Sequence, residues 1–358
     1  MTDLLDVRGL TVELSTPEGW VRPVNDVSLR IDAGESLGLV GESGSGKTML
    51  ALALMGLLPT GARLSGEAWL ENEVKEVEEV REAKEKSAGG ATSDSLKARP
   101  DRRNAHRKNL VAMKEGEWRE VRGGEIAMVF QEPMTSLNPV MRIGAQIEEA
   151  IRAHEARLAG DDVKRRAQEA LRRAAVPEPE ERAEQFPHQL SGGLRQRAMI
   201  AMALAAGPRL LIADEPTTAL DVTVQKQILD LLDRLRRELR LGLLFITHDL
   251  GVAAQVAERV AVMYAGRIVE EGPAREVLAA PRHPYTQGLL KASPTLKRGS
   301  LIPIPGTVPQ LMALPPGCAF EPRCALRRAE CVSGVPALRA AGANHGARCI
   351  LVEEVMKE

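Results

Sequence analysis

The segment GESGSGKT at residues 41–48 limits the possible folds of this chain more than any other feature of its sequence. It fits the pattern G-x-x-x-x-G-K-[S/T] and follows the apolar run Ser36–Val40, which is typical of a buried strand. A helix is predicted next, over Met49–Leu57. In such a unit the glycines let backbone N–H groups approach a phosphate chain, and the helix N-terminus adds positive potential. The alternative is a glycine-rich turn that fits a short pattern by chance.

This loop and its neighbours form the predicted nucleotide-binding site. Lys47 is expected to neutralise the β- and γ-phosphates of ATP, and Thr48 to hold Mg²⁺ through its hydroxyl. Trp20 lies in a region of alternating apolar and polar residues, 4–40, and is a candidate to stack on adenine. A partly exposed hairpin tryptophan is the alternative. The predicted nucleotide contacts are Gly41, Glu42, Ser43, Gly44, Ser45, Gly46, Lys47, Thr48, Met49 and Trp20.

Two further apolar runs end in polar residues. Leu210–Ala213 precedes Asp214 and Glu215, and Leu243–Thr247 precedes His248. Buried parallel strands deliver such residues to one edge of a sheet. We expect Asp214 to bind Mg²⁺ and Glu215 to act as general base on a water in line with the γ-phosphate. His248 would contact that phosphate and orient the water; a satisfied core or surface histidine is the alternative.

A glutamine at the end of a third predicted strand completes the catalytic set. Gln131 follows Ile126–Phe130 and can bridge Mg²⁺ or the attacking water. The loop Glu132–Pro139 leads into a segment of helical periodicity, about 140–190, which predicts a helical subdomain.

A second loop has the composition of an anion site. A serine and two glycines open a helix predicted over Arg195–Ala206, where N–H groups and the helix dipole attract anions. A chain that already holds one nucleotide has no evident use for this site, unless it serves another subunit. The alternative is a capped helix start. The residues of the loop are Leu190, Ser191, Gly192, Gly193 and Gln196.

The five segments, in this order, resemble the ATPases of ABC transporters. The resemblance implies an α/β P-loop ABC-type nucleotide-binding domain with a parallel core sheet, an antiparallel β-subdomain and a helical subdomain. It also implies two domains that sandwich two ATPs, so that Ser191 and Gly193 contact a γ-phosphate in trans. Asp221, in TTALD, would communicate between the two sites, and the Gln131 region would couple ATP to membrane subunits.

The C-terminal part resembles one branch of that family. HPYTQGLL from His283, then PIPGTVPQL and PPGCAFEPRC, are similar to the extension of oligopeptide/dipeptide ABC importer ATPases. This divides the chain into an ATPase domain, 1–280, and a loop-rich extension, 281–358. The resemblance implies a motor subunit for import of di- or oligopeptides, with a second ATPase subunit (identical or related), two transmembrane permeases and an extracytoplasmic substrate-binding protein.

Two other functions stay open from the sequence. Relatives of this kind differ in cargo, so nickel or another small solute is an alternative. A soluble ABC ATPase acting on ribosomes or DNA would normally need two tandem ATPase domains or a long coiled coil, and the sequence shows neither.

All four cysteines lie in the extension, and a cytosolic location argues against disulfides. Their spacing differs from the tight pairs of zinc ribbons, whereas four thiolates on loops can hold a [4Fe-4S] cluster, as similar cysteines suggest in some importer ATPases. Free thiols and zinc are the alternatives, and His345 is a spare ligand. The cysteines are Cys318, Cys324, Cys331 and Cys349.

Charge and hydropathy limit the partners. The net charge is −1, from 48 basic and 49 acidic residues, so we expect no nucleic acid. The N-terminus lacks the features of a signal peptide, and the apolar run Ala198–Ala206 is far shorter than the roughly 20 residues that span a bilayer. We therefore expect a soluble protein held by its partners at the cytoplasmic side of the inner membrane.

An insertion of about 71–121 departs from a compact ABC domain. Glu71–Lys86 is rich in glutamate and lysine, Ser87–Ser95 is a linker, and Lys97–Lys108 is strongly basic. A solvated helix with a flexible linker is one interpretation. A docking arm for a partner or for anionic lipid is the other.

Overall fold

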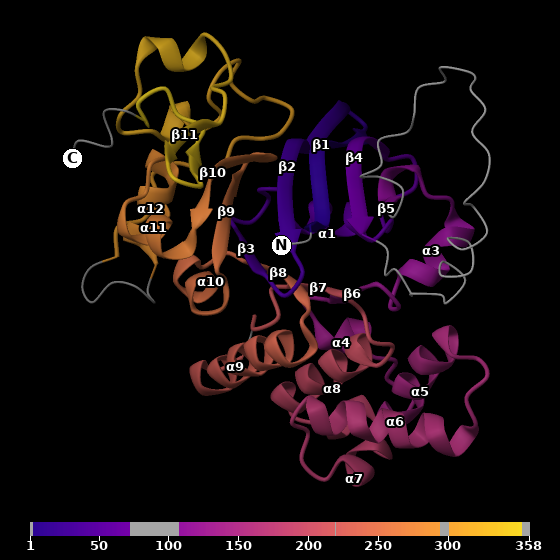
Figure 1. Ribbon diagram of the computed structural model, residues 1–358. Helices are drawn as coiled ribbons and strands as arrows, with labels where there is room; N and C mark the ends of the chain where they lie inside the picture. Colours follow the sequence, from indigo (N-terminus) through magenta and orange to yellow (C-terminus); the bar gives the residue numbers. More distant parts are fainter. Residues whose placement is uncertain (1–2, 72–106, 219, 294–300, 353–358) are drawn as a thin grey trace, which may run out of the picture.

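The computed structural model describes residues 3–71, 107–218, 220–293 and 301–352 (Figure 1). Two sheets form the upper and middle parts of the molecule in that view, and a group of helices lies below the edge formed by β6, β7 and β8. The α/β architecture predicted from the motifs is therefore present, with each of its three expected parts.

The smaller sheet is antiparallel and holds the N-terminal residues. Its order is β2-β1-β4-β5, and the strands span Gly19–Asp32, Asp3–Thr16, Arg63–Glu71 and Arg107–Asn109 respectively. In β2, Val27, Leu29 and Ile31 are buried, whereas Ser28 and Arg30 between them are exposed. This alternation follows from one face packing on the core and the other facing water.

The larger sheet has eight strands in the order β11-β12-β10-β9-β3-β8-β7-β6. Neighbouring strands in the part β9-β3-β8-β7-β6 are parallel, and the neighbours in the part β11-β12-β10-β9 are antiparallel. Every residue of β3, β7 and β8 is buried, because both faces of this part of the sheet are covered. The strands are β3 (Ser36–Val40), β6 (Ile126–Val129), β7 (Leu210–Asp214), β8 (Gly242–Thr247), β9 (Arg259–Tyr264), β10 (Arg267–Pro273), β11 (Arg339–Gly342) and β12 (His345–Ala347).

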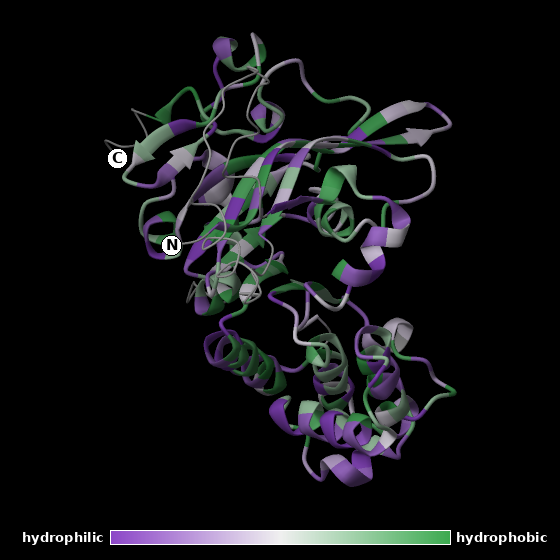
Figure 2. Cartoon of the chain, turned by 45° about the vertical axis from the view of Figure 1, so that its right-hand side comes forward, coloured by the Kyte–Doolittle hydropathy of each residue, from purple (hydrophilic) through white to green (hydrophobic). Residues whose placement is uncertain are grey.

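The helical subdomain has a core of its own. Figure 2 shows its helices, at the bottom of the molecule, with many hydrophilic residues beside hydrophobic ones, as amphipathic helices require. Ala198 and Ala201 of α8 pack into this core, while Met199 and Ile200 pack against the central sheet, so α8 joins the two. The helices are α4 (Pro133–Ser136), α5 (Ile143–His154), α6 (Gly160–Arg173), α7 (Pro179–Ala183) and α8 (Gly192–Leu204).

The other helices flank the two sheets. They are α1 (Lys47–Leu54), α3 (Glu115–Val121), α9 (Val222–Leu239), α10 (Leu250–Val256), α11 (Ala274–Ala279) and α12 (Pro284–Ala292). None of the helices in the described ranges combines the length and hydrophobicity needed to cross a bilayer.

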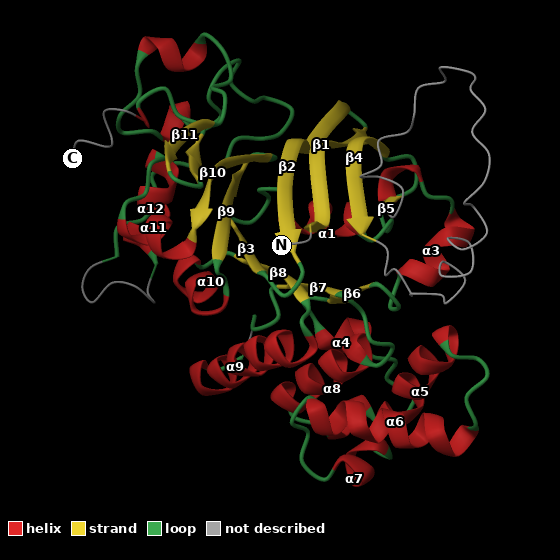
Figure 3. Ribbon diagram, viewed as in Figure 1, coloured by secondary structure: helices red, strands yellow, loops and turns green. Residues whose placement is uncertain are grey.

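The C-terminal extension is mainly loop, as predicted (green in Figure 3), but it is built onto the ATPase domain. Strand β12 pairs with β10, so the extension continues the central sheet. Tyr285 and Phe320 pack with Tyr264 of β9, with ring centroids 4.5 and 5.3 Å from it. The predicted boundary at residue 280 therefore does not separate two cores, because residues on either side of it pack together.

The C-terminal part of the insertion predicted over about 71–121 is folded onto the rest of the domain. Residues 107–121 form β5, a 3-10 turn and α3, and Trp118 is only 5% exposed. Arg107 and Lys108, at the end of the predicted basic run, are ion-paired with Asp3 and Glu125. These residues belong to the fold, because their side chains pack and pair within it. The rest of the predicted insertion, including the glutamate- and lysine-rich segment after residue 71, the linker and the basic run up to 106, lies outside the described residues.

Candidate nucleotide-binding site

The phosphate loop connects β3 to α1, as the motif predicts. β3 ends at Val40 and α1 begins at Lys47. Gly46 has φ +107°, and a Cβ on it would overlap the carbonyl oxygen of Pro23. Only glycine fits at this position, because the backbone is left-handed and passes directly against the β-subdomain.

Lys47 is held inside this loop. Its Nζ donates to the carbonyl oxygens of Gly41 at 2.7 Å and Glu42 at 3.0 Å. The side chain is buried, which lowers the pKa of its ammonium, although the carboxylates of Glu215 and Asp214 act in the opposite direction. A bound polyphosphate would give this buried cation a counter-charge, which favours anion binding at this place.

A cleft of about 740 Å³ brings the predicted site residues together. Most residues of the phosphate loop line it, and so do Gln131, Glu215 and His248, the catalytic candidates that lie far from the loop in the sequence. Gly41 and Ser45 are buried beneath its surface. The residues that line the cleft are Pro23, Glu42, Ser43, Gly44, Gly46, Lys47, Thr48, Met49, Gln131, Glu215, His248, Val308 and Leu311.

Glu215 is the centre of a polar cluster in the cleft. Its Oε2 accepts from Thr218 Oγ1 at 3.0 Å and from Gln131 Nε2 at 3.5 Å, and lies 3.3 Å from His248 Nδ1. The hydrogen bond to His248 lowers the pKa of Glu215, and the same bond raises the pKa of His248. The backbone of Glu215 has φ +45°, which is strained for a residue with a side chain and is common at functional sites.

Asp214 and Thr48 fit a divalent cation. Asp214 is 2% exposed, and its Oδ1 is buried without a hydrogen-bond partner among the residues that the structure describes. Burial raises the pKa of this carboxyl, while a hydrogen bond from the Thr48 hydroxyl favours its charged form. An unsatisfied buried oxygen is costly, and a Mg²⁺ ion, which prefers oxygen ligands, would satisfy it. Gln131 lines the same cleft.

The second predicted anion loop opens α8 but does not line this cleft. Ser191 is the N-cap of α8, and its Oγ accepts from Leu194 N at 3.3 Å. Ser191 and Gly192 are exposed and available to a partner. Gly193 packs against Val224, so a Cβ there would approach Val224 Cγ1 to 2.8 Å.

Two other predicted residues of this loop are inside the chain. Leu190 is 4% exposed and belongs to the core of the helical subdomain, and Gln196 is 2% exposed. Both side chains are covered in the isolated chain, so a role for these two residues towards another subunit stays a prediction. Asp221 caps α9, with Oδ1 accepting from Val224 N at 2.9 Å.

Trp20 does not line the cleft. It is 43% exposed, and the guanidinium of Arg63 lies 3.9 Å from the centroid of its ring. The partly exposed hairpin tryptophan, which was the alternative, therefore describes this residue. Val308 and Leu311 also line the cleft, although neither was among the predicted site residues. No local pattern marks them, because they come from the loop-rich extension.

The four cysteines line one small pocket of about 10 Å³. Burial raises the pKa of the Cys318 thiol to about 11, and burial also raises the pKa of Cys324 and of Cys349. All four are free, and across the described residues no three His, Cys, Asp or Glu side chains are arranged to hold a metal ion. The thiols as placed therefore give no support to the predicted cluster.

His345 serves a different purpose from the predicted spare ligand. Its Nε2 lies 2.8 Å from Oε1 of Glu270, which is fully buried. The pair ties β12 to β10, and this buried hydrogen bond explains why the ring is not directed to the cysteines.

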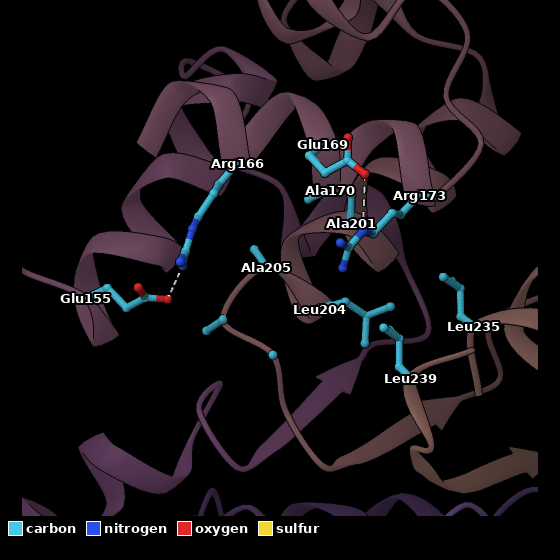
Figure 4. Close-up of a pocket in the computed structure, with 13 residues that line it drawn as sticks. Glu155, Arg166, Glu169, Ala170, Arg173, Ala201, Leu204, Ala205, Leu235 and Leu239 are labelled. Atoms are coloured by element: carbon cyan, nitrogen blue, oxygen red, sulfur yellow. Dashed lines mark hydrogen bonds and ion pairs between the residues drawn. The ribbon is translucent and has the colours of Figure 1, made fainter. Parts of the chain in front are cut away.

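A separate pocket of about 330 Å³ lies where α6, α8 and α9 meet (Figure 4). Its charged groups pair among themselves, Arg166 with Glu155 and Arg173 with Glu169. It contains none of the motif residues, so the cleft at the phosphate loop is the candidate site.

Comparisons with known proteins agree with this geometry. Residues 24–218 match the family model described as ABC transporter, which covers more than half of the chain. This chain belongs to the ABC transporter ATPase family. Residues 269–331 match a second model, described as the oligopeptide/dipeptide transporter, C-terminal region. The ATPase family and the peptide-transporter branch predicted from the motifs are confirmed. The cleft at the phosphate loop is the candidate ATP site of this ABC ATPase.

Relatives resemble the chain over nearly its whole length. A putative peptide import ATP-binding protein of Brucella melitensis is 46% identical, with 98% of each chain covered. The oligopeptide transport ATP-binding protein OppD of Bacillus subtilis is also 46% identical, over 90% of this chain and 82% of that protein. Among solved structures, a dimeric post-hydrolysis state of an ATP-binding cassette with ADP and phosphate is similar, with a TM-score of 0.59 and 27% identity, covering 76% of this chain and 99% of the other.

Proposed function

We propose that the chain is the ATP-hydrolysing motor subunit of an importer of di- or oligopeptides. The observation that carries this proposal is the similarity to the peptide import proteins over 98% of the chain. The match of residues 269–331 to the oligopeptide/dipeptide transporter region supports it independently of the ATPase motifs.

Hydrolysis would use the residues that meet in the cleft. The triphosphate binds the loop N–H groups and the ammonium of Lys47. A water attacks the γ-phosphorus as its bond to the bridging oxygen of ADP breaks, and Glu215 takes the proton of that water. The low pKa of Glu215 keeps its carboxylate ionised, as a proton acceptor must be. His248 and Gln131, within hydrogen-bond distance of the same carboxylate, would hold the water in line.

The residues of the site offer the oxygen ligands that Mg²⁺ prefers. Thr48 and Asp214 would hold the ion, with Gln131 as the third candidate: Thr48 and Gln131 line the cleft, and Asp214 is hydrogen-bonded to Thr48. When bound, Mg²⁺ supplies positive charge to the β- and γ-phosphates.

A second ATPase subunit, identical or related, would complete the site. Ser191 and Gly192 are exposed at the N-terminus of a 13-residue helix and lie outside the chain's own cleft. They suit an anion presented by another molecule. Gly193 would lie beside them, and Asp221, at the start of α9, would be near the same interface.

Membrane partners follow from the importer function. Two permease subunits would receive the movement of the Gln131 loop, and an extracytoplasmic binding protein would deliver the cargo. The chain would then sit at the cytoplasmic side of the inner membrane. Transport by the chain reconstituted with its permeases in vesicles tests this: ATP-dependent uptake of labelled short peptides supports the proposal. Uptake of nickel or another small solute with no uptake of peptides contradicts it.

We also propose an iron–sulfur cluster at the cysteine pocket, on the chemistry of its donors. Four cysteines line one small pocket, although they are not arranged there to hold a metal ion, and the sulfurs of Cys331 and Cys349 each accept a backbone N–H at 3.4 Å, as cluster sulfurs commonly do. The thiols would have to lose their protons and turn inward. Anaerobic purification with iron, sulfide and zinc analysis tests this proposal: about four irons per chain supports it, and a metal-free or zinc-only protein contradicts it.

A further inference from the structure

An ion pair joins the C-terminal extension to the phosphate loop. Nη1 and Nη2 of Arg323 donate to the two carboxylate oxygens of Glu42 at 2.7 and 3.0 Å. Arg323 is held in place by the carbonyl oxygen of Pro305, 2.9 Å from its Nε. Only 4% of the arginine side chain is exposed, so the fork has a fixed orientation on the carboxylate.

Tyr285 of the extension holds the backbone of the same residue. Its hydroxyl accepts the N–H of Glu42 at 2.9 Å, and Tyr285 itself is fully buried. The N–H of Glu42 is therefore directed towards the extension, and both ends of this loop residue are fixed by C-terminal side chains.

The ion pair has an electrostatic consequence for nucleotide binding. Glu42 lines the cleft together with Lys47 and Thr48. An unpaired carboxylate here would repel a polyphosphate, because like charges a few ångströms apart interact strongly where water is partly excluded. The guanidinium of Arg323 neutralises this charge on the side facing the extension.

The extension reaches the cleft at a second place. Val308 and Leu311 line it, and Met312 Sδ lies 3.8 Å from Thr16 Oγ1 in the β1–β2 hairpin. Figure 1 shows this loop extending from the C-terminal part towards β2. The C-terminal extension therefore forms part of the wall of the nucleotide cleft.

From these contacts we propose that Arg323 is a positioning residue for ATP: it neutralises Glu42 and fixes the phosphate loop, so the C-terminal extension completes the nucleotide site of its own chain. The proposal rests on ATP binding, which the family establishes, and is independent of the cargo and of any cluster at the cysteines.

Isothermal titration of ATP, ADP and AMP into purified variants tests the proposal. Arg323→Ala is expected to weaken ATP about tenfold, which is about 1.4 kcal/mol, with a smaller loss for ADP and the smallest for AMP, because repulsion grows with phosphate charge. Adding Glu42→Gln to Arg323→Ala removes the carboxylate and should recover most of the loss. Arg327→Ala, an exposed arginine in the same loop, is the matched control.

The graded loss and its recovery distinguish positioning from general destabilisation. Far-ultraviolet circular dichroism and thermal unfolding show which variants are folded; if Arg323→Ala is not, Arg323→Gln undergoes the same measurements. Equal losses for the three nucleotides, no loss, or no recovery with Glu42→Gln in folded proteins would overturn the proposal. If the reconstituted parent protein took up no peptide while the variants still showed the graded loss of nucleotide affinity, only the importer function would be contradicted.

Discussion

Glu215 combines a strained backbone with a carboxylate that contacts three polar side chains. Its φ of +45° and its contacts with Gln131, Thr218 and His248 fix the side chain towards the cleft. Glu215→Gln retains the shape but cannot take a proton. We expect ATP hydrolysis to fall by about 10²–10⁴-fold, the usual contribution of a general base, while ATP affinity stays near that of the parent. Phosphate release and ATP titration measure the two quantities; turnover within a few-fold of the parent would remove Glu215 from the role of base.

The pair of Glu215 and His248 also predicts a titration. Glu215 raises the pKa of His248 and His248 lowers that of Glu215, so the pair is charged between the two values. Its contribution to stability is lost as pH rises through the raised pKa of His248, and as pH falls through the lowered pKa of Glu215. Histidine NMR of the nucleotide-free protein should give a His248 midpoint above the usual value of about 6.5, and Glu215→Gln should lower it. An unchanged midpoint in that variant would show that the pair does not form in solution.

At the scale of elements, the conformation of the phosphate loop depends on the close packing of Gly46, which precedes α1, against Pro23 of β2. Gly46→Ala places a Cβ onto the carbonyl oxygen of Pro23 and strains a left-handed backbone. Because backbone cannot move aside as a flexible side chain can, we expect the loop to shift and ATP affinity to fall by at least tenfold. Gly34→Ala is the control: its φ is also positive, at +79°, but its Cβ would meet nothing within 4 Å. ATP titration of both folded variants checks this, and equal effects on affinity would contradict the steric argument.

The predictability of elements from the sequence depended on how local their signals were. The strands that end at Val40, Asp214 and Thr247 were recognisable because strands buried on both faces are continuous apolar runs. The contacts of the C-terminal extension with the cleft were not recognisable, because they join residues far apart in the sequence. Arg323 and Glu42, for example, are 281 positions apart, and no sequence motif links the two. The alternating pattern likewise places Trp20 in a hairpin but cannot show that the guanidinium of Arg63 lies over its ring or that Trp20 lies outside the lining of the cleft.

At the scale of the whole molecule, the described part of the chain presents a complete phosphate loop and, outside the cleft of that loop, a second loop with the composition of an anion site. Ser191 is exposed at the N-terminus of α8 and accepts only the local cap hydrogen bond from Leu194 among the contacts described. If two chains close over ATP, a large cation at this position would occupy the space of the γ-phosphate. We therefore expect Ser191→Arg to leave ATP binding to the isolated chain near the parent value while it prevents ATP-dependent dimerisation and hydrolysis.

Sedimentation velocity with ATP in the Glu215→Gln background provides the measurement, because slow hydrolysis should keep the closed dimer intact. Ser333→Arg, an exposed serine of the extension, is the matched control and should dimerise as the parent does. A Ser191→Arg protein that still dimerised with ATP would show that the exposed loop of α8 takes no part in the sandwich. Loss of ATP binding by the monomer would point instead to damage that α8, which packs on both cores, transmits to the nucleotide cleft.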